Sequence, residues 1–314
     1  MVLLVLAVAC RGDGHEAGPV PQGVPADSAG TAGLLLYRDA GAGQAVAVDL
    51  SNGERRPVAG VAAGAAYTMS AFDCTRDGRL IAYANIAANG RASVVTLVGD
   101  GVSGRSIDVP GAIDGMAWAP GGERIAMTAA DESGYHLTLL DIGSGATSTV
   151  PSGTGLPGPP RWSPDGQRLV VDINENGQSG IYVLEIATAN LVKVSTLPSA
   201  FTADWSPDGG TIVFGGTEQP GGFSQLFAVD ADGKNERKLT NSDTQKWLPR
   251  WSLDGSLISY AGSVTAPAVS MLPAALHTQA VWVVSADGTN ESQVTDIALD
   301  ATPLAWCPPG PWLE

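Results

Sequence analysis

The stretch RWSPDGQRLVVD, residues 161–172, contains a five-residue sequence, WSPDG, that recurs along the chain at a nearly constant interval. Aligned on the final glycine, the copies are CTRDG at 74–78, WAPGG at 118–122, WSPDG at 162–166, WSPDG at 205–209, WSLDG at 251–255 and WCPPG at 306–310. Their first residues are separated by 44, 44, 43, 46 and 55 positions. A period of about 40–45 residues with short strands between turns is typical of β-propeller blades.

Apolar, β-branched runs follow each of the first five motifs, for example RLVVDIN, GIYVLEI and LVKVSTL after the third. Such runs, bounded by Gly, Asn and Asp, predict strands, so each repeat is a four-stranded antiparallel unit whose inner strand leads into the motif. In the turn, Pro presets φ, Asp accepts hydrogen bonds from nearby amides, and Gly supplies a positive φ. The Trp offers a large surface to bury against a neighbouring blade. We therefore predict a structural role for the motif.

The strand count predicts how the ring closes. Only a short tail follows the sixth motif, whereas residues 34–60 supply three strands, LLLYRD, QAVAVDL and RRPVAG, without an inner strand of their own. We expect the strand near 300–306 to join these three in a composite blade. The sequence thus predicts an all-β, six-bladed propeller with no exposed sheet edge.

These residues resemble the TolB-like propeller repeat family, in which WSPDG lies between the first two strands of each blade. The resemblance covers about 33–310 and departs from the pattern at Cys74 for Trp, Gly121 and Pro309 for Asp, and Leu253 for Pro. TolB itself carries an α/β domain before its propeller, and we expect no such domain in this chain. A role in the Tol–Pal envelope system therefore does not transfer directly. The hydrolase domain of prolyl-oligopeptidase-like relatives is not expected either, because the sequence contains no G-x-S-x-G elbow.

The N-terminal stretch MVLLVLAVAC contains an apolar run that is too short to span a bilayer and fits the core of a signal peptide. Its end, AVAC, resembles a bacterial lipobox, in which Cys10 is acylated, although Ala7 replaces the usual Leu and no basic residue precedes the run. A buried strand is the alternative. Residues 11–32 are rich in Gly, Pro and Ala and predict a flexible tether. We predict a signal segment at 1–10, a tether at 11–32 and the propeller at 33–314, in an extracytoplasmic lipoprotein that meets the membrane only through its anchor.

The formal net charge of −15 argues against binding to a nucleic acid backbone, which requires clustered Lys and Arg. His136 and His277 are too far apart in sequence to suggest a histidine metal site. We expect a monomer without a cofactor.

Two further groups have alternatives that the sequence leaves open. Cys74 and Cys307 occupy adjacent motif positions in blades that neighbour each other in the closed ring, and they form either a disulfide or two buried thiols. Asp172, Asn174 and Asn176 begin like a calcium loop, but Val183 replaces the carboxylate at the twelfth position. An ordinary hairpin explains the same residues.

The residue before each motif points toward the axis, and four of these are charged: Asp73, Arg161, Asp204 and Arg250. They form inter-blade ion pairs or line a polar channel that accepts a ligand. We expect the long connection 263–278 to lie on the face of the interblade loops. Its residues Val269, Met271, Leu272, Leu276 and His277 are predicted either to meet a partner or to cap the blade.

We predict a non-enzymatic binding propeller of the bacterial cell envelope that engages a protein or peptide partner through its loop face. The alternative is a propeller hydrolase or lyase acting on a peptide or polysaccharide, which requires paired carboxylates or a bound metal.

Overall fold

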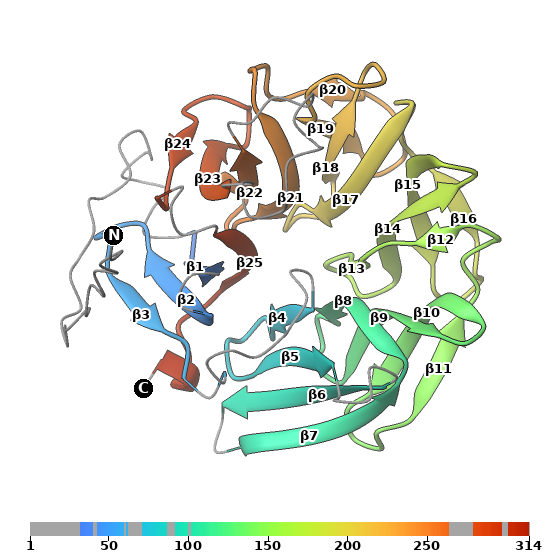
Figure 1. Cartoon of the computed structure of the whole chain (residues 1–314), viewed down its shortest axis with the longest axis vertical. Helices are drawn as coiled ribbons and strands as arrows, with labels where there is room; N and C mark the ends of the chain where they lie inside the picture. Colours follow the sequence, from blue (N-terminus) through green and yellow to red (C-terminus); the bar gives the residue numbers. More distant parts are fainter. Residues whose placement is uncertain are drawn as a thin grey trace, which may run out of the picture.

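The computed structural model describes residues 32–39, 43–59, 61, 71–86, 92–99, 102–263, 279–296 and 301–313. Six antiparallel sheets are arranged in a ring around a central channel (Figure 1). This confirms the predicted six-bladed propeller. Within the described ranges no helix has the length and apolar character needed to cross a membrane.

Each blade is one sheet whose strands follow one another outward from the channel. Five blades contain β4 (Phe72–Cys74) to β7 (Val102–Pro110), β8 (Ala112–Trp118) to β11 (Thr147–Val150), β12 (Leu156–Pro157) to β16 (Leu191–Lys193), β17 (Ser199–Trp205) to β20 (Arg237–Lys238), and β21 (Gln245–Trp251) to β24 (Ser292–Gln293). The remaining strands of these five blades, in sequence order, are β5 (Ile81–Ile86), β6 (Ala92–Gly99), β9 (Arg124–Asp131), β10 (Gly134–Asp141), β13 (Arg161–Trp162), β14 (Arg168–Glu175), β15 (Gln178–Glu185), β18 (Thr211–Thr217), β19 (Gln225–Asp230), β22 (Leu257–Ser263) and β23 (Gln279–Ser285). In the third of these blades the inner strand is split into β12 and β13, which both pair with β14.

The sixth blade combines the two ends of the described chain. Its strand order is β25 (Thr302–Cys307), β1 (Leu34–Asp39), β2 (Gln44–Asp49) and β3 (Arg55–Pro57). Leu35 pairs with Trp306 in the β1–β25 ladder, and Figure 1 shows the two strands side by side. The predicted composite blade is therefore present, and it closes the ring through backbone hydrogen bonds.

The motif turn is held by a repeated set of hydrogen bonds. In the third motif, Ser163 Oγ donates to Asp165 Oδ1 at 2.5 Å and accepts from the Arg168 amide at 2.9 Å. Asp165 Oδ1 also accepts from the Gln167 amide at 3.0 Å. Gly166 has a φ of 69°, which a residue with a Cβ rarely adopts. The serine, the aspartate and the glycine of the motif thus close one tight turn.

The rest of the motif joins neighbouring blades. Buried residues form six apolar clusters between blades. Four of the clusters include a buried motif tryptophan, Trp118, Trp162, Trp205 or Trp306, and the partly buried Trp251 packs against a fifth. The motif glycine packs on the motif proline of the preceding blade: a methyl group on Gly209 would lie 3.4 Å from Pro164 Cδ. The predicted burial of tryptophan between blades is confirmed.

The remaining interface has a cysteine where the others have tryptophan. Cys74 packs there with Cys307 and with Trp312, which lies in a short 3₁₀ helix, Pro311–Leu313. Trp312 is 1% exposed, and its Nε1 donates to the Gly78 carbonyl at 2.7 Å. A tryptophan from the chain's last turn therefore fills the interface that lacks the motif tryptophan.

The Cys74 and Cys307 sulfurs lie 2.07 Å apart, with Cα atoms separated by 6.1 Å. The fold thus brings the two thiols to bonding distance, as one of the two sequence alternatives requires. Oxidation of the pair in the protein stays a prediction.

Candidate functional site

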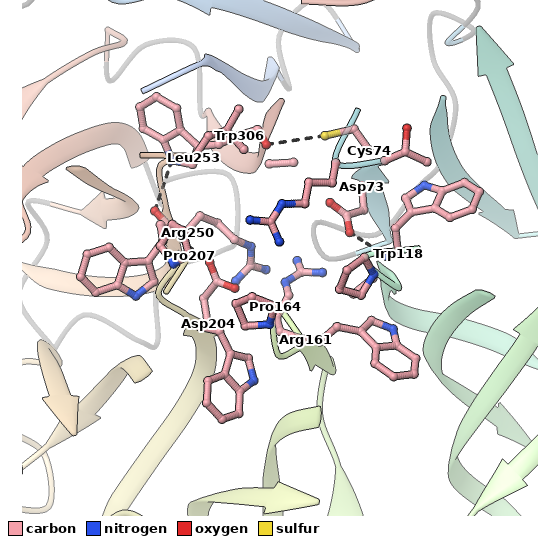
Figure 2. Close-up of a pocket in the computed structure, with 18 of the residues that line it drawn as sticks. Asp73, Cys74, Trp118, Arg161, Pro164, Asp204, Pro207, Arg250, Leu253 and Trp306 are labelled. Carbon is pink, nitrogen blue, oxygen red and sulfur yellow. Dashed lines mark hydrogen bonds between the residues drawn. The ribbon is translucent and has the colours of Figure 1, made fainter. Parts of the chain in front are cut away.

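A pocket of about 190 Å³ lies where the channel opens among the six motif turns, an end of the ring that we call the motif face. The inner strands end at this face because each runs directly into its motif. The pocket's wall consists of motif tryptophans and prolines, including Trp118, Trp205, Pro164 and Pro207. Four charged residues, Asp73, Arg161, Asp204 and Arg250, line its interior and point toward the axis (Figure 2). We call this the channel pocket.

The two aspartates of the channel pocket bind the backbone of the following blade. Asp73 Oδ2 accepts from the Trp118 amide at 2.8 Å, and Asp204 Oδ2 accepts from the Trp251 amide at 2.8 Å. The residue before the motif in one blade therefore braces the motif tryptophan of the next. These contacts replace the ion pairs that were one alternative from the sequence.

The two arginines also use backbone acceptors. Arg161 Nη1 donates to the Met116 carbonyl of the preceding blade, and Arg250 Nη1 donates to the Pro249 carbonyl at 2.8 Å. Arg161 is 6% exposed and Arg250 is 4% exposed. In the described part of the chain, Nε and Nη2 of Arg161 and Nε of Arg250 have no hydrogen-bond acceptor. The two guanidinium groups thus line the pocket with hydrogen-bonding capacity that the described residues do not use.

Burial shifts the pKa of three of these groups. Desolvation raises the pKa of Asp73, and the charge of Arg161 partly offsets this rise. Desolvation likewise raises the pKa of Asp204, opposed chiefly by Arg250 and Arg161. Desolvation and then repulsion from Arg161 lower the pKa of Arg250 to about 9, which leaves the guanidinium charged at neutral pH. The pocket therefore holds charged groups at a cost in solvation.

Arg76 is a channel-pocket residue that the sequence analysis missed. It is the third residue of the first motif, where the third and fourth motifs have proline, and it is exposed at the pocket wall. An arginine at the position that normally carries the motif proline is the signal that could have identified it.

The residues of the predicted calcium loop do not converge. Asp172 Oδ1 accepts from the Thr202 amide of the next blade at 3.1 Å, whereas Asn174 Oδ1 accepts from the Gly177 amide in its own hairpin. Asn176 has a φ of 54° in that turn. Asp172 and Asn174 share one face of β14. Asp172, however, pairs with Ile181 and so lies two positions further from the turn than Asn174, which pairs with Ser179, and it binds the next blade instead of the hairpin. The hairpin alternative accounts for these residues, and the calcium expectation is not supported by their placement.

Other predicted sites lie outside the described residues. These are Cys10 with the signal segment and tether, and the loop residues Val269, Met271, Leu272, Leu276 and His277. Their roles stay predictions.

The family model "TolB beta propeller domain" matches residues 112–310. The chain belongs to this family. The Tol-Pal system protein TolB of Anaeromyxobacter dehalogenans is 27% identical over 128 residues, a match that covers 41% of this chain and 29% of that protein. The matched region is therefore less than a third of the relative's length.

Two solved structures with the same fold extend the comparison. TolB of Acinetobacter baumannii superposes with a TM-score of 0.68 at 16% identity, covering 89% of this chain and 68% of that one. A protein assigned as TolB in Agrobacterium tumefaciens superposes with a TM-score of 0.65 at 16% identity, covering 87% of this chain and 96% of that one. The family resemblance drawn from the WSPDG repeats is thus confirmed.

Proposed function

We propose that this TolB-family propeller is a non-enzymatic binding module of the bacterial cell envelope, and that it holds a partner protein at the motif face. The observation that carries the proposal is the channel pocket. The tryptophans of its rim are packed between blades, and the prolines Pro164 and Pro207 lie against the motif glycine of the next blade. Its volume of about 190 Å³ is below the ~300–1,000 Å³ of sites that enclose small molecules. A protruding residue of a partner protein fits such a pocket.

Location in the envelope is supported by two features of the chain. The N-terminal apolar run ending at Cys10 resembles a lipoprotein signal. The Cys74–Cys307 pair lies at bonding distance, and disulfides persist in oxidising, extracytoplasmic compartments. The TolB relative from Anaeromyxobacter dehalogenans is described as a Tol-Pal system protein, which is consistent with an envelope partner.

The enzyme alternative requires two carboxylates that act together, whereas the two in the channel pocket, Asp73 and Asp204, are each engaged in holding the backbone of a different blade. Asp73 lies in β4 and Asp204 lies in β17, three blades away around a ring of six. Each already accepts a backbone amide of the next blade. We therefore favour binding over catalysis.

Photo-crosslinking in the native cell tests the proposal. A photoreactive residue replaces Pro164 or Pro207 at the motif face, Leu276 in the long loop, or Val192, which is 47% exposed on the outer strand β16. We expect one protein product from both motif-face positions and none from position 192. A product from position 276 alone would move the partner to the opposite face. The absence of a protein product at every position would refute the proposal.

A further inference from the structure

The channel pocket contains cationic donors that the fold leaves unused. Arg161 and Arg250 are both more than nine-tenths buried, and three of their N–H-bearing nitrogens have no acceptor among the described residues. Burying a donor without an acceptor is unfavourable, particularly for a charged group. A guanidinium presents a planar set of donors that matches a carboxylate. These two side chains are therefore suited to binding an anion in the channel pocket.

The aspartates of the channel pocket do not neutralise this site fully. Asp73 and Asp204 oppose three arginines, Arg76, Arg161 and Arg250, so the lining carries one excess positive charge when all five are ionised. The whole chain has a net charge of −15. A positive lining in so acidic a protein favours a localised anionic group, while the negative surroundings are screened beyond about 8–10 Å at ordinary ionic strength.

The shape of the pocket restricts the ligand to one small group. The wall around the arginines is made of indole rings and prolines, which offer apolar contacts to the stem of an acidic side chain or to a chain end. A volume of about 190 Å³ accommodates such a group.

We propose that the channel pocket is a carboxylate site, in which Arg161 and Arg250 donate to an acidic side chain or to the C-terminal carboxylate of the partner protein. This inference deepens the proposed function. It rests on that function only for the identity of the molecule that supplies the carboxylate, namely the partner protein. The residues Asp73 and Asp204 are positioning residues, since they fix the motif backbone around the site.

Acetate is the probe for the site itself. Five tryptophans line the pocket, so acetate binding to the full-length protein should change intrinsic fluorescence in a saturable way at constant ionic strength. Arg250→Gln should weaken acetate binding by about tenfold or more, as expected for losing a charged hydrogen-bond donor. Arg237→Gln removes an exposed arginine from the outer strand β20 and should leave acetate affinity unchanged. No saturable response in the wild type, or equal affinity in Arg250→Gln, would overturn the proposal.

A built-in carboxylate provides a second test that does not remove an arginine. Ala305 holds the ring position between Arg250 and Asp73, and it lines the channel pocket. Ala305→Asp should occupy the site and abolish the acetate response, whereas the isosteric Ala305→Asn should retain it. Folding of both variants is checked by their circular dichroism. Wild-type acetate affinity in a folded Ala305→Asp protein would contradict the assignment.

Peptides identify the source of the carboxylate. One peptide carries glutamates and an amidated C-terminus, and the other is neutral with a free C-terminus; whichever displaces acetate identifies the source. If neither displaces acetate, the partner-derived carboxylate is ruled out. Partner crosslinks that persist at full yield in Arg250→Gln would keep the proposed function and remove the carboxylate site. Acetate binding without any crosslinked partner would keep the carboxylate site and remove the proposed function.

Discussion

Breaking the Cys74–Cys307 bond should destabilise the propeller mainly through its unfolded state. The two cysteines are separated by 233 residues, so the crosslink encloses most of the ring. The interface around them is also packed by Trp312, and we expect this contact to remain when the bond is broken. The reduced protein should therefore still fold, with a lower free energy of unfolding.

The size of the effect follows from the loop length. For a loop of 233 residues, the chain-entropy relation gives a loss of about 18 cal/mol/K in the unfolded state, or about 5 kcal/mol at 25 °C. Measured disulfides usually contribute about 2–4 kcal/mol, because the reduced unfolded chain retains structure and the crosslink can distort native geometry. We expect reduction to lower the free energy of unfolding by about 2–5 kcal/mol.

Urea unfolding of the same protein with and without a phosphine reductant measures this difference in the free energy of unfolding without substituting any residue. Cys74→Ala with Cys307→Ala should behave like the reduced protein, apart from small changes in packing. The oxidised protein should also show a smaller dependence of the free energy on urea, because its unfolded state exposes less surface. Equal midpoints with and without reductant, or two alkylatable thiols at positions 74 and 307 in the unreduced protein, would refute this reasoning.

Three other predictions follow from the hydrogen bonds and pKa shifts. Desolvation raises the pKa of the Asp172 carboxyl from 3.8 to about 6 in the folded state. The folded state therefore binds this proton more tightly than the unfolded state does, and the free energy of unfolding falls as the pH rises between those two values. Asp172→Asn should thus unfold less readily than the wild type at pH 8, by up to about 3 kcal/mol, with the difference vanishing near pH 4 in urea titrations. The second motif lacks the serine and aspartate of the turn, so Ala119→Ser with Gly121→Asp should raise the free energy of unfolding by about 1 kcal/mol, and a loss of stability would count against the turn assignment. Ser259→Ala should lower it by about 1 kcal/mol, because Trp306 Nε1 donates to Ser259 Oγ at 2.9 Å; an unchanged urea midpoint would show that this bond contributes nothing.

The fold was predictable because its information is local and repeated. A glycine ends all six motifs, and a hydroxyl–aspartate pair closes the turn in four of them, so each of these four specifies its own turn through three residues. The copies are spaced by about one blade. The composite blade followed from counting strands at the two ends, and the pairing of Leu35 with Trp306 bears this out. A departure from the pattern in one motif, such as Cys74 in place of Trp, does not change the turns formed by the other motifs.

The candidate site was predictable only in part, since its chemistry depends on contacts between distant residues. The sequence placed Asp73, Arg161, Asp204 and Arg250 at the channel but left open ion pairs that the structure replaces with backbone contacts. Which atom of a neighbouring blade each side chain reaches depends on the pitch and closure of the whole ring. Trp312 was missed for the same reason, because nothing in its local sequence indicates that it fills the interface at Cys74.

The charges of the channel pocket are better explained by binding than by folding. The same ring position is alanine in two blades, Ala117 and Ala305, and both residues are buried in well-packed sheets. A charged side chain there is thus not required to build a blade. The other four blades carry charges whose desolvation raises the pKa of Asp73 and Asp204 and lowers that of Arg250, which is a cost to stability. Charged residues that depart from the repeat and lower the stability of the fold are expected at a ligand-binding site. For the aspartates, the hydrogen bonds to backbone amides of the next blade offset part of this desolvation penalty. For Arg161 and Arg250, the nitrogens without an acceptor gain compensating hydrogen bonds only when an anion binds.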